Sequence, residues 1–157
     1  MKLSEIFSQD AFIPQLRSDT RDGAIQELLE VLLAADQLSS QDYRQILQAL
    51  IDREANGSTG FGKGVSVPHS QHRAVKKTAL AIGHSTKGLD FNALDKAPVY
   101  SVLLLLSPAN DHDRHLQAME LVFGNLQRPG FRNALRQAST PKAVLELIAE
   151  TEGSKAN

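Results

Sequence analysis

The feature that most constrains the fold is a nearly unbroken apolar run from Val99 to Leu106, bounded by Pro98 and Pro108. Its length suits a β-strand, and a strand that is apolar on both sides is typical of one buried on both faces. In an α/β protein, helices pack on the sheet that contains such a strand. The chain has 157 residues, of which 41% are apolar, and this fits one domain with a core of its own.

Helical and strand periodicities predict the elements around this run. Apolar residues recur at helical spacing from Thr20 to Ala35 and from Ser40 to Glu54. Short strands are expected at Val65 to Val67 and at Thr78 to His84. Further helices are predicted after a cap at Asn110 or Asp111, over Phe131 to Ala138, and from Thr140-Pro141 onward.

The C-terminal third of the chain carries two more expectations. The helix after Asp111 is expected to face the core with Leu116, Met119, Val122, Phe123 and Leu126. Gly153 onward is interpreted as a frayed tail. Since there is no internal repeat and no linker, residues 1–157 are predicted to form a single α/β domain, a sandwich of one central sheet with helices packed on it. The pattern leaves the order of the strands open.

Composition excludes several classes of function. The 17 basic and 18 acidic residues give a net charge of −1, which gives no reason to expect nucleic acid or an anionic membrane surface as a partner. The absence of cysteine excludes disulfides and thiolate catalysis. No apolar run is long enough for membrane insertion, and Met1 to Gln9 lacks the apolar core of a signal peptide. We therefore expect a cytoplasmic protein.

A glycine-rich loop, Gly57-Ser-Thr-Gly-Phe-Gly-Lys-Gly64, follows the second predicted helix. It fits the first part of the P-loop pattern, but Gly64 stands where a magnesium-binding serine or threonine is needed, and a helix precedes the loop instead of a strand. Nucleotide binding is therefore disfavoured. Two interpretations remain: a flexible connector, or a phosphate cradle made by Ser58, Thr59 and Gly60 with their backbone amides and hydroxyls.

His69 comes shortly after this loop. Because Val67 precedes Pro68, Val67 is held extended and Pro68 has a fixed φ, so the histidine is presented in a defined direction. Neutral imidazole is a good nucleophile near pH 7 and can take a phosphoryl group onto a ring nitrogen. No metal or other cofactor is needed if fixed cations and amides neutralise the phosphoryl oxygens. The simpler interpretation is a polar residue at the end of a strand.

Zinc binding is an alternative use of the histidines. His112 and His115 are three residues apart and share a predicted helix, while His69 and His72 lie in the preceding half of the chain. Without cysteine, a zinc site would need three histidines or a carboxylate from separated segments.

The residues around His69 resemble those of a known family. Arg53-Glu54, followed by Gly57 to His69, is similar to the active-site signature of the enzyme IIA proteins of the bacterial phosphoenolpyruvate phosphotransferase system, fructose/mannitol type. The Gly-Ser-Thr-Gly motif is most similar to that of the nitrogen-regulatory branch. Further matches bring the resemblance to roughly the whole chain: Val99 to Leu106, Ser107-Pro108-Ala109, His115-Leu116 and Thr151-Glu152-Gly153.

This resemblance implies a fold, a reaction and partners. The fold is an α/β domain with a mixed sheet flanked by helices. His69 would accept phosphate from an HPr-type histidine phosphocarrier, with Arg53 and His115 beside the phosphohistidine. His112 competes with His115 for the second role, but the Leu116 that follows His115 fits the family pattern. The simpler interpretations are a helix-end arginine that contacts the last carbonyls and a half-exposed helix histidine.

Ser70 departs from the family pattern, which commonly has glycine directly after the active histidine. The leading hypothesis is a stand-alone regulator of the nitrogen branch, whose phosphorylation state sets which target proteins it binds. One alternative is a sugar-specific component that passes phosphate to enzyme IIB. The other, motivated by Ser70, is a binding module that has lost transfer.

Overall fold

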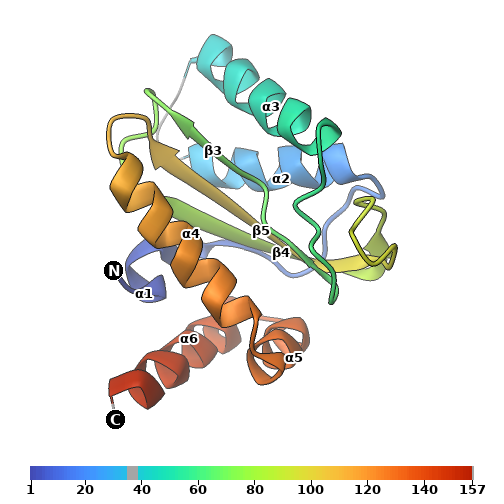
Figure 1. Cartoon of the computed structure of the whole chain (residues 1–157), viewed down its shortest axis with the longest axis vertical. Coiled ribbons are helices and arrows are strands. Elements are labelled where there is room, and N and C mark those ends of the chain that lie inside the picture. Colours follow the sequence, from blue (N-terminus) through green and yellow to red (C-terminus); the bar gives the residue numbers. More distant parts are fainter. Residues whose placement is uncertain (35–38, 157) are drawn as a thin grey trace.

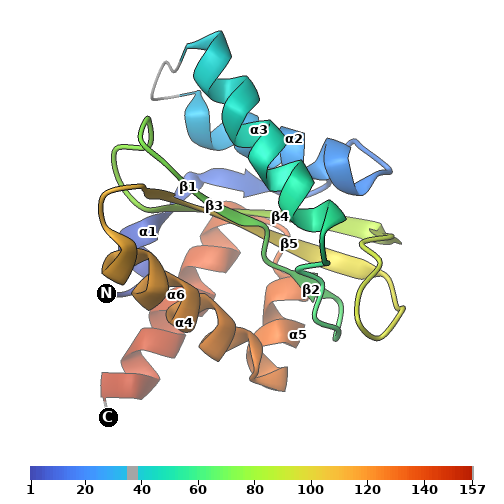
Figure 2. The same ribbon diagram turned by 45° about the horizontal axis from the view of Figure 1, so that its top comes forward.

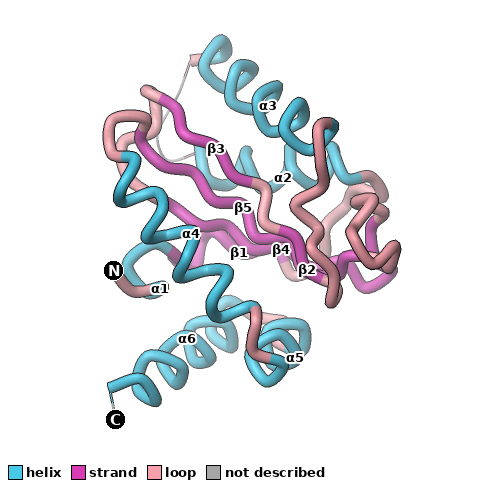
Figure 3. Tube along the Cα trace, in the orientation of Figure 1, coloured by secondary structure: helices cyan, strands magenta, loops and turns pink. Residues whose placement is uncertain are grey.

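The apolar run forms strand β5, Val99–Pro108, and nearly all of its side chains are buried. The prediction of a strand covered on both faces is therefore confirmed. Our computed structural model describes residues 1–34 and 39–156. Within them, β5 pairs antiparallel with β4, Ala79–Leu89, and parallel with β2, Val65–Ser66, and β3, His69–His72. Strand β1, Phe7–Ile13, pairs parallel with β4 and completes a mixed sheet in the order β1-β4-β5-β2 (Figure 3).

Helices cover both faces of this sheet (Figures 1 and 2). Helices α2, Arg21–Leu33, and α3, Ser40–Ala55, lie on one side. The other side carries α1, Leu3–Ile6, α4, His112–Leu126, α5, Pro129–Gln137, and α6, Pro141–Ala156. The predicted α/β sandwich with a mixed central sheet flanked by helices is thus confirmed. No helix in the described part of the chain is long and apolar enough to cross a membrane.

The predicted helix starts agree with the observed caps. The Thr20 and Ser39 side chains accept hydrogen bonds from the amides of Gly23 and Asp42, and they fix the first turns of α2 and α3. Asp111 accepts the Arg114 amide at 3.1 Å and so fixes the first turn of α4. The expected end of the first long helix, Ala35, lies outside the described residues.

The packing of α2 on the sheet depends on Gly83 in β4. A Cβ atom at Gly83 would lie 2.9 Å from a methyl group of Leu16 and 3.0 Å from one of Leu28. Contacts this short do not occur without movement of a neighbour, so the absence of a side chain lets the helix approach the strand closely. This layer holds α3 as well, because α3 packs on α2.

Two predictions about local structure were wrong, and one strand was missed. Strand β1 was not predicted, because a register shift between Phe7 and Phe12 breaks the alternation of buried and exposed residues. Leu116 is 47% exposed, whereas His115 is buried; the inner face of α4 is His115, Ala118, Val122, Asn125 and Leu126.

The third error concerns the tail. Helix α6 continues through Gly153 to Ala156, where a frayed tail was expected. The Glu152 carboxylate accepts the Ser4 amide at 2.9 Å and the Ser4 hydroxyl at 3.0 Å. These bonds join the last helix to α1 directly before Gly153, a contact between distant residues that local sequence does not show.

Two leucine truncations test this arrangement. Leu104 is fully buried in β5, so Leu104→Ala should lower the free energy of unfolding by about 2–5 kcal/mol, because it leaves a cavity. Leu116→Ala should change it by about 0.5 kcal/mol or less, as expected at an exposed site. Urea denaturation followed by circular dichroism measures both. A large loss of stability in Leu116→Ala would instead support the inward orientation of Leu116 that the sequence predicts.

Candidate functional site

His69 is the first residue of β3, and its position follows from its neighbours on both sides. Val67 is fully buried, and the Pro68 carbonyl accepts the Leu105 amide at 2.9 Å, so the segment is attached to β5 before the strand begins. His69 itself is half-buried, opposite Leu105 in the parallel pairing. The predicted defined presentation of this histidine is therefore observed.

The His69 ring is fixed by one hydrogen bond. Its Nδ1 lies 2.7 Å from the Val67 carbonyl oxygen. A carbonyl oxygen only accepts, so Nδ1 must carry the hydrogen, and in the neutral ring Nε2 keeps its lone pair. Nε2 is therefore the ring nitrogen of His69 whose lone pair is available to react.

His115 lies beside this ring, in the first turn of α4. The two ring centroids are 6.0 Å apart. His115 is buried, and its Nδ1 lies 2.7 Å from the Ser107 hydroxyl at the end of β5. Burial lowers the pKa of His115 below its ordinary value, and the neighbouring His69 and His112 lower it further. The lowered pKa favours the neutral imidazole of His115.

His112 is exposed and lies one ring further out, 6.5 Å from His115 between centroids. Its Nδ1 lies 3.1 Å from Gln71 Oε1, while Gln71 Nε2 donates to the Pro108 carbonyl at 3.2 Å. Gln71 therefore joins β3 to the start of α4. This bridge keeps the helix that carries His115 next to the strand that carries His69.

The glycine-rich loop is organised by internal hydrogen bonds. The Thr59 amide donates to Glu54 Oε2 at 3.0 Å, and its hydroxyl donates to Glu54 Oε1. The Gly60 amide donates to the Ser58 hydroxyl oxygen at 2.9 Å. The structure thus differs from the expected cradle in one respect: the amides of Thr59 and Gly60 and the Thr59 hydroxyl are already bonded within the protein.

Two residues of this region remain available at the surface. Arg53 is exposed, and its Nη1 donates to the Gly57 carbonyl at 2.5 Å. This is close to the simpler interpretation of a helix-end arginine, although one bond leaves most of the guanidinium donors open. Among the described residues, the Ser58 amide has no hydrogen-bond partner.

The histidines are not grouped as a metal site. His72 accepts the Ala74 amide at Nδ1 and contacts Gln45 of α3 through Nε2, so it joins β3 to that helix. Across residues 1–34 and 39–156, no three His, Asp or Glu side chains are placed to hold one metal ion. The zinc alternative has no support in this geometry.

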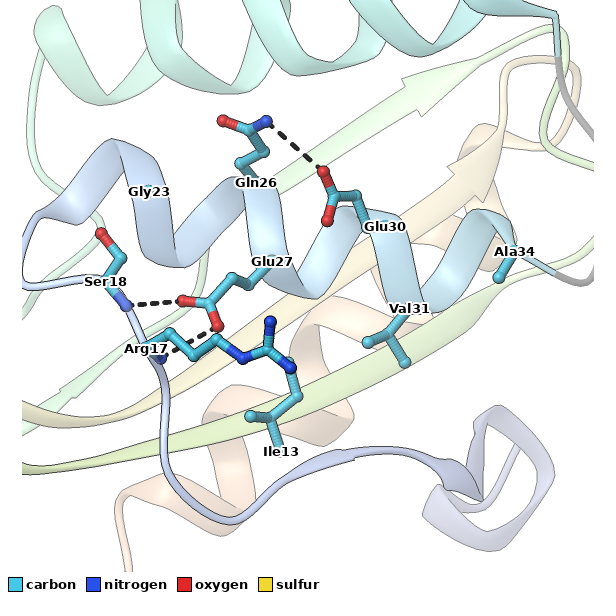
Figure 4. Close-up of a pocket in the computed structure, with 9 residues that line it drawn as sticks. All are labelled: Ile13, Arg17, Ser18, Gly23, Gln26, Glu27, Glu30, Val31 and Ala34. Atoms are coloured by element: carbon cyan, nitrogen blue, oxygen red, sulfur yellow. Dashed lines mark hydrogen bonds between the residues drawn. The ribbon is translucent and has the colours of Figure 1, made fainter.

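A groove of about 650 Å³ lies elsewhere, between α2 and the segment after β1 (Figure 4). Glu27 lines the groove and accepts the amides of Arg17 and Ser18, both at 2.9 Å. None of the predicted site residues lines this groove.

Proteins of known class are similar to this chain in sequence and fold. A fructose-specific EIIA component of the phosphotransferase system from Haloferax volcanii is 33% identical over 131 residues, which cover 83% of this chain and 84% of that protein. A nitrogen regulatory protein from Pseudomonas aeruginosa is 32% identical over 135 residues, covering 85% and 88%. The crystal structure of nitrogen regulatory protein IIA-Ntr from Neisseria meningitidis superposes with a TM-score of 0.82 at 26% identity, covering 92% and 97%.

The mixed sheet between two helical layers defines the class as a single-sheet α/β sandwich. The model of the family described as phosphoenolpyruvate-dependent sugar phosphotransferase system, EIIA 2, matches residues 3–151. The chain belongs to this family of phosphoryl-transfer proteins.

The structure also adds residues that sequence analysis did not single out. Ser107 and Gln71 contact the second histidine and its helix, and Glu54 holds the loop. Ser107 was quoted in the family match without a role. Gln71 shares the face of β3 with His69, two residues away, and this spacing is the signal that could have found it.

The pH dependence of stability tests the environment of His115. Its pKa is lower in the folded protein than the unfolded value of about 6.5. The unfolded chain therefore binds more protons below that pH, and the contribution of His115 to stability is lost as pH falls from about 6.5 toward the folded pKa. Urea denaturation should show a smaller loss of stability between pH 7.5 and 5.5 in His115→Gln than in the unmodified protein. Equal losses would contradict the burial of a neutral His115.

Proposed function

We propose that the protein carries a phosphoryl group covalently on His69 Nε2, accepting it from an HPr-type histidine phosphocarrier in the cytoplasm. The observation that carries this proposal is the 2.7 Å contact between His69 Nδ1 and the Val67 carbonyl. It leaves a single ring nitrogen with a lone pair, and that nitrogen is part of a half-buried ring at the edge of the sheet.

The transfer needs no separate proton acceptor. The His69 Nε2 lone pair attacks phosphorus in line, the P–N bond to the carrier's histidine breaks, and its electron pair returns to that ring. The phosphorylated His69 ring carries positive charge and keeps its hydrogen on Nδ1. The Val67 carbonyl stabilises this charge, because a carbonyl dipole accepts more strongly from a charged donor.

We assign His115 as a hydrogen-bond donor to a phosphoryl oxygen. If the Ser107 hydroxyl donates to His115 Nδ1, the hydrogen of the neutral ring resides on Nε2. That N–H supports the phosphoryl group without ever becoming phosphorylated, since its lone pair is bonded to Ser107.

Arg53 and Ser58 complete the proposed phosphate site. The free guanidinium donors of Arg53 suit phosphate oxygens, which they bind in pairs. Ser58 contributes its amide and hydroxyl, while Thr59 and Gly60 shape the loop through bonds to Glu54 and Ser58. An added Cβ at Gly60 would lie 3.0 Å from the Ala93 Cβ, so the absence of a side chain lets this loop pack closely on the segment after β4.

Ser70 does not weaken this proposal. It lies in the extended strand β3, opposite Leu106, and its φ is not among the positive values that favour glycine. A serine therefore adopts the backbone at this position without strain. Backbone strain at Ser70 therefore gives no motive for a module that has lost transfer.

We propose that the protein acts in the nitrogen-regulatory branch of the phosphotransferase system, where its phosphorylation state sets which target proteins it binds. The Neisseria meningitidis structure, at a TM-score of 0.82, supports this branch. Sequence identity does not separate it from the sugar branch, since the fructose-specific and nitrogen-regulatory relatives are 33% and 32% identical. Rapid passage of phosphate to a sugar-specific enzyme IIB would instead favour the alternative.

Labelling tests the acceptor residue. With labelled phosphoenolpyruvate, enzyme I and the phosphocarrier, the protein should acquire acid-labile, alkali-stable label. His69→Ala should acquire none, because no other imidazole is proposed to accept phosphate. His112→Ala is the matched control and should be labelled fully. Label on folded His69→Ala would refute the assignment.

Transfer rates test the two supporting residues. Arg53→Ala should slow transfer by roughly 10²–10³-fold, by analogy with donors at oxyanion sites, and Arg53→Lys should also be clearly slower because lysine offers only a point charge. His115→Ala should be slow but still labelled on His69. Quench-flow measurements of the transfer rate, with His112→Ala as the reference, show which histidine supports transfer. If only the reference is slow, the second histidine is His112, not His115.

A further inference from the structure

Glu54 is a buried carboxylate that the transfer step does not use. It lies in the last turn of α3 and is only 3% exposed. Removing a carboxylate from water costs several kcal/mol unless it is well bonded. Within residues 1–34 and 39–156, no lysine, arginine or histidine forms an ion pair with it. Both of its oxygens instead accept hydrogen bonds from one residue, Thr59.

Thr59 continues this contact toward the active histidine. Its carbonyl accepts the Val67 amide at 3.4 Å, and the Val67 carbonyl lies 2.7 Å from His69 Nδ1. Thr59 and Val67 are buried as well. A continuous series of hydrogen bonds therefore runs from α3 through the loop to the ring of His69.

We propose that Glu54 is a positioning residue: by holding Thr59, it fixes Val67 and so keeps His69 in the tautomer whose Nε2 is nucleophilic. This inference rests on the proposed function only for its effect on transfer. The effect on the tautomer follows from the hydrogen bonds alone.

The chemistry of the pair explains why a carboxylate holds Thr59 most strongly. Thr59 presents two donors, an amide and a hydroxyl, and an ionised carboxylate offers two oxygens that only accept. A glutamine has the same shape but offers one oxygen and one NH₂ group. In Glu54→Gln, the amide oxygen can still accept the Thr59 amide, but the NH₂ group only donates, so the Thr59 hydroxyl must turn its hydrogen away and accept. Both charge-assisted hydrogen bonds then become weaker neutral ones, which loosens Thr59 and with it the Val67 carbonyl.

A second carboxylate provides the matched control. Asp52 lies in the same part of α3, is exposed, and accepts Gln48 Nε2 at 2.8 Å. Asp52→Asn removes the same charge two positions away without touching the loop. Any effect of net charge alone should appear in both variants.

The experiment combines two readouts on the full chain. Nitrogen-15 NMR of the imidazole rings reports which nitrogen of His69 carries the hydrogen. Quench-flow transfer from the phosphocarrier reports the rate at saturation and the apparent KM. We expect Glu54→Gln to show a mixture of His69 tautomers and a rate lower by roughly 10–100-fold with an unchanged KM, by analogy with groups that orient metal-binding histidines. Asp52→Asn should match the unmodified protein in both the His69 tautomer and the transfer rate.

The outcomes are distinguishable. A folded Glu54→Gln with an unchanged His69 tautomer overturns the inference. A changed tautomer, in a protein that is never labelled on His69, supports the inference and overturns the proposed function. If Glu54→Gln does not fold, Thr59→Val replaces it, since valine keeps the shape and removes one of the two donors. An unchanged tautomer in Thr59→Val then overturns the inference.

Discussion

The burial of β5 on both faces determines most of what surrounds it. Its apolar side chains need a helical layer on each side, and its two edges need partners for their backbone groups. Strand β4 pairs along one edge, and β2 and β3 share the other. The same strand builds the site: the register places His69 opposite Leu105, and Ser107 at its end contacts His115. A shift of β5 along its axis would therefore disturb the core and the histidine pair together.

The sequence predicts this fold well where the signal is local. The apolar run, the helix caps at Thr20 and Asp111, and the breaks at proline and glycine lie within a few residues of the elements they define. Prediction fails where contacts between residues distant in the sequence determine the structure. The register shift in β1 hides the alternation of its buried and exposed residues. The Glu152–Ser4 bonds, which join residues 148 positions apart, attach α6 to α1 directly before Gly153. Leu116 is apolar but lies outside the inner face that His115 begins.

The residues of the site also differ in how far the sequence predicts them. His69 is predictable because the loop and Pro68 precede it directly and because the family signature ends on it. Its supporting contacts are not predictable from spacing, since Gln71 reaches Pro108 across 37 residues and the partner of His69 is a backbone carbonyl. The carboxylate of Glu54 is visible in the sequence, but its burial and its bonds to Thr59 are not. The physical reason is that hydrogen-bond partners are chosen by the packed fold, whereas residue types alone leave many partners open.

The central claim is that one nitrogen of one histidine carries the phosphate, because the Val67 carbonyl occupies the other. The most direct test is phosphorus–nitrogen correlation NMR on the phosphorylated, nitrogen-15-labelled protein. The account predicts a single phosphorus signal coupled to Nε2 of His69, with the hydrogen still on Nδ1. Coupling to Nδ1, or to a nitrogen of His112 or His115, would contradict it.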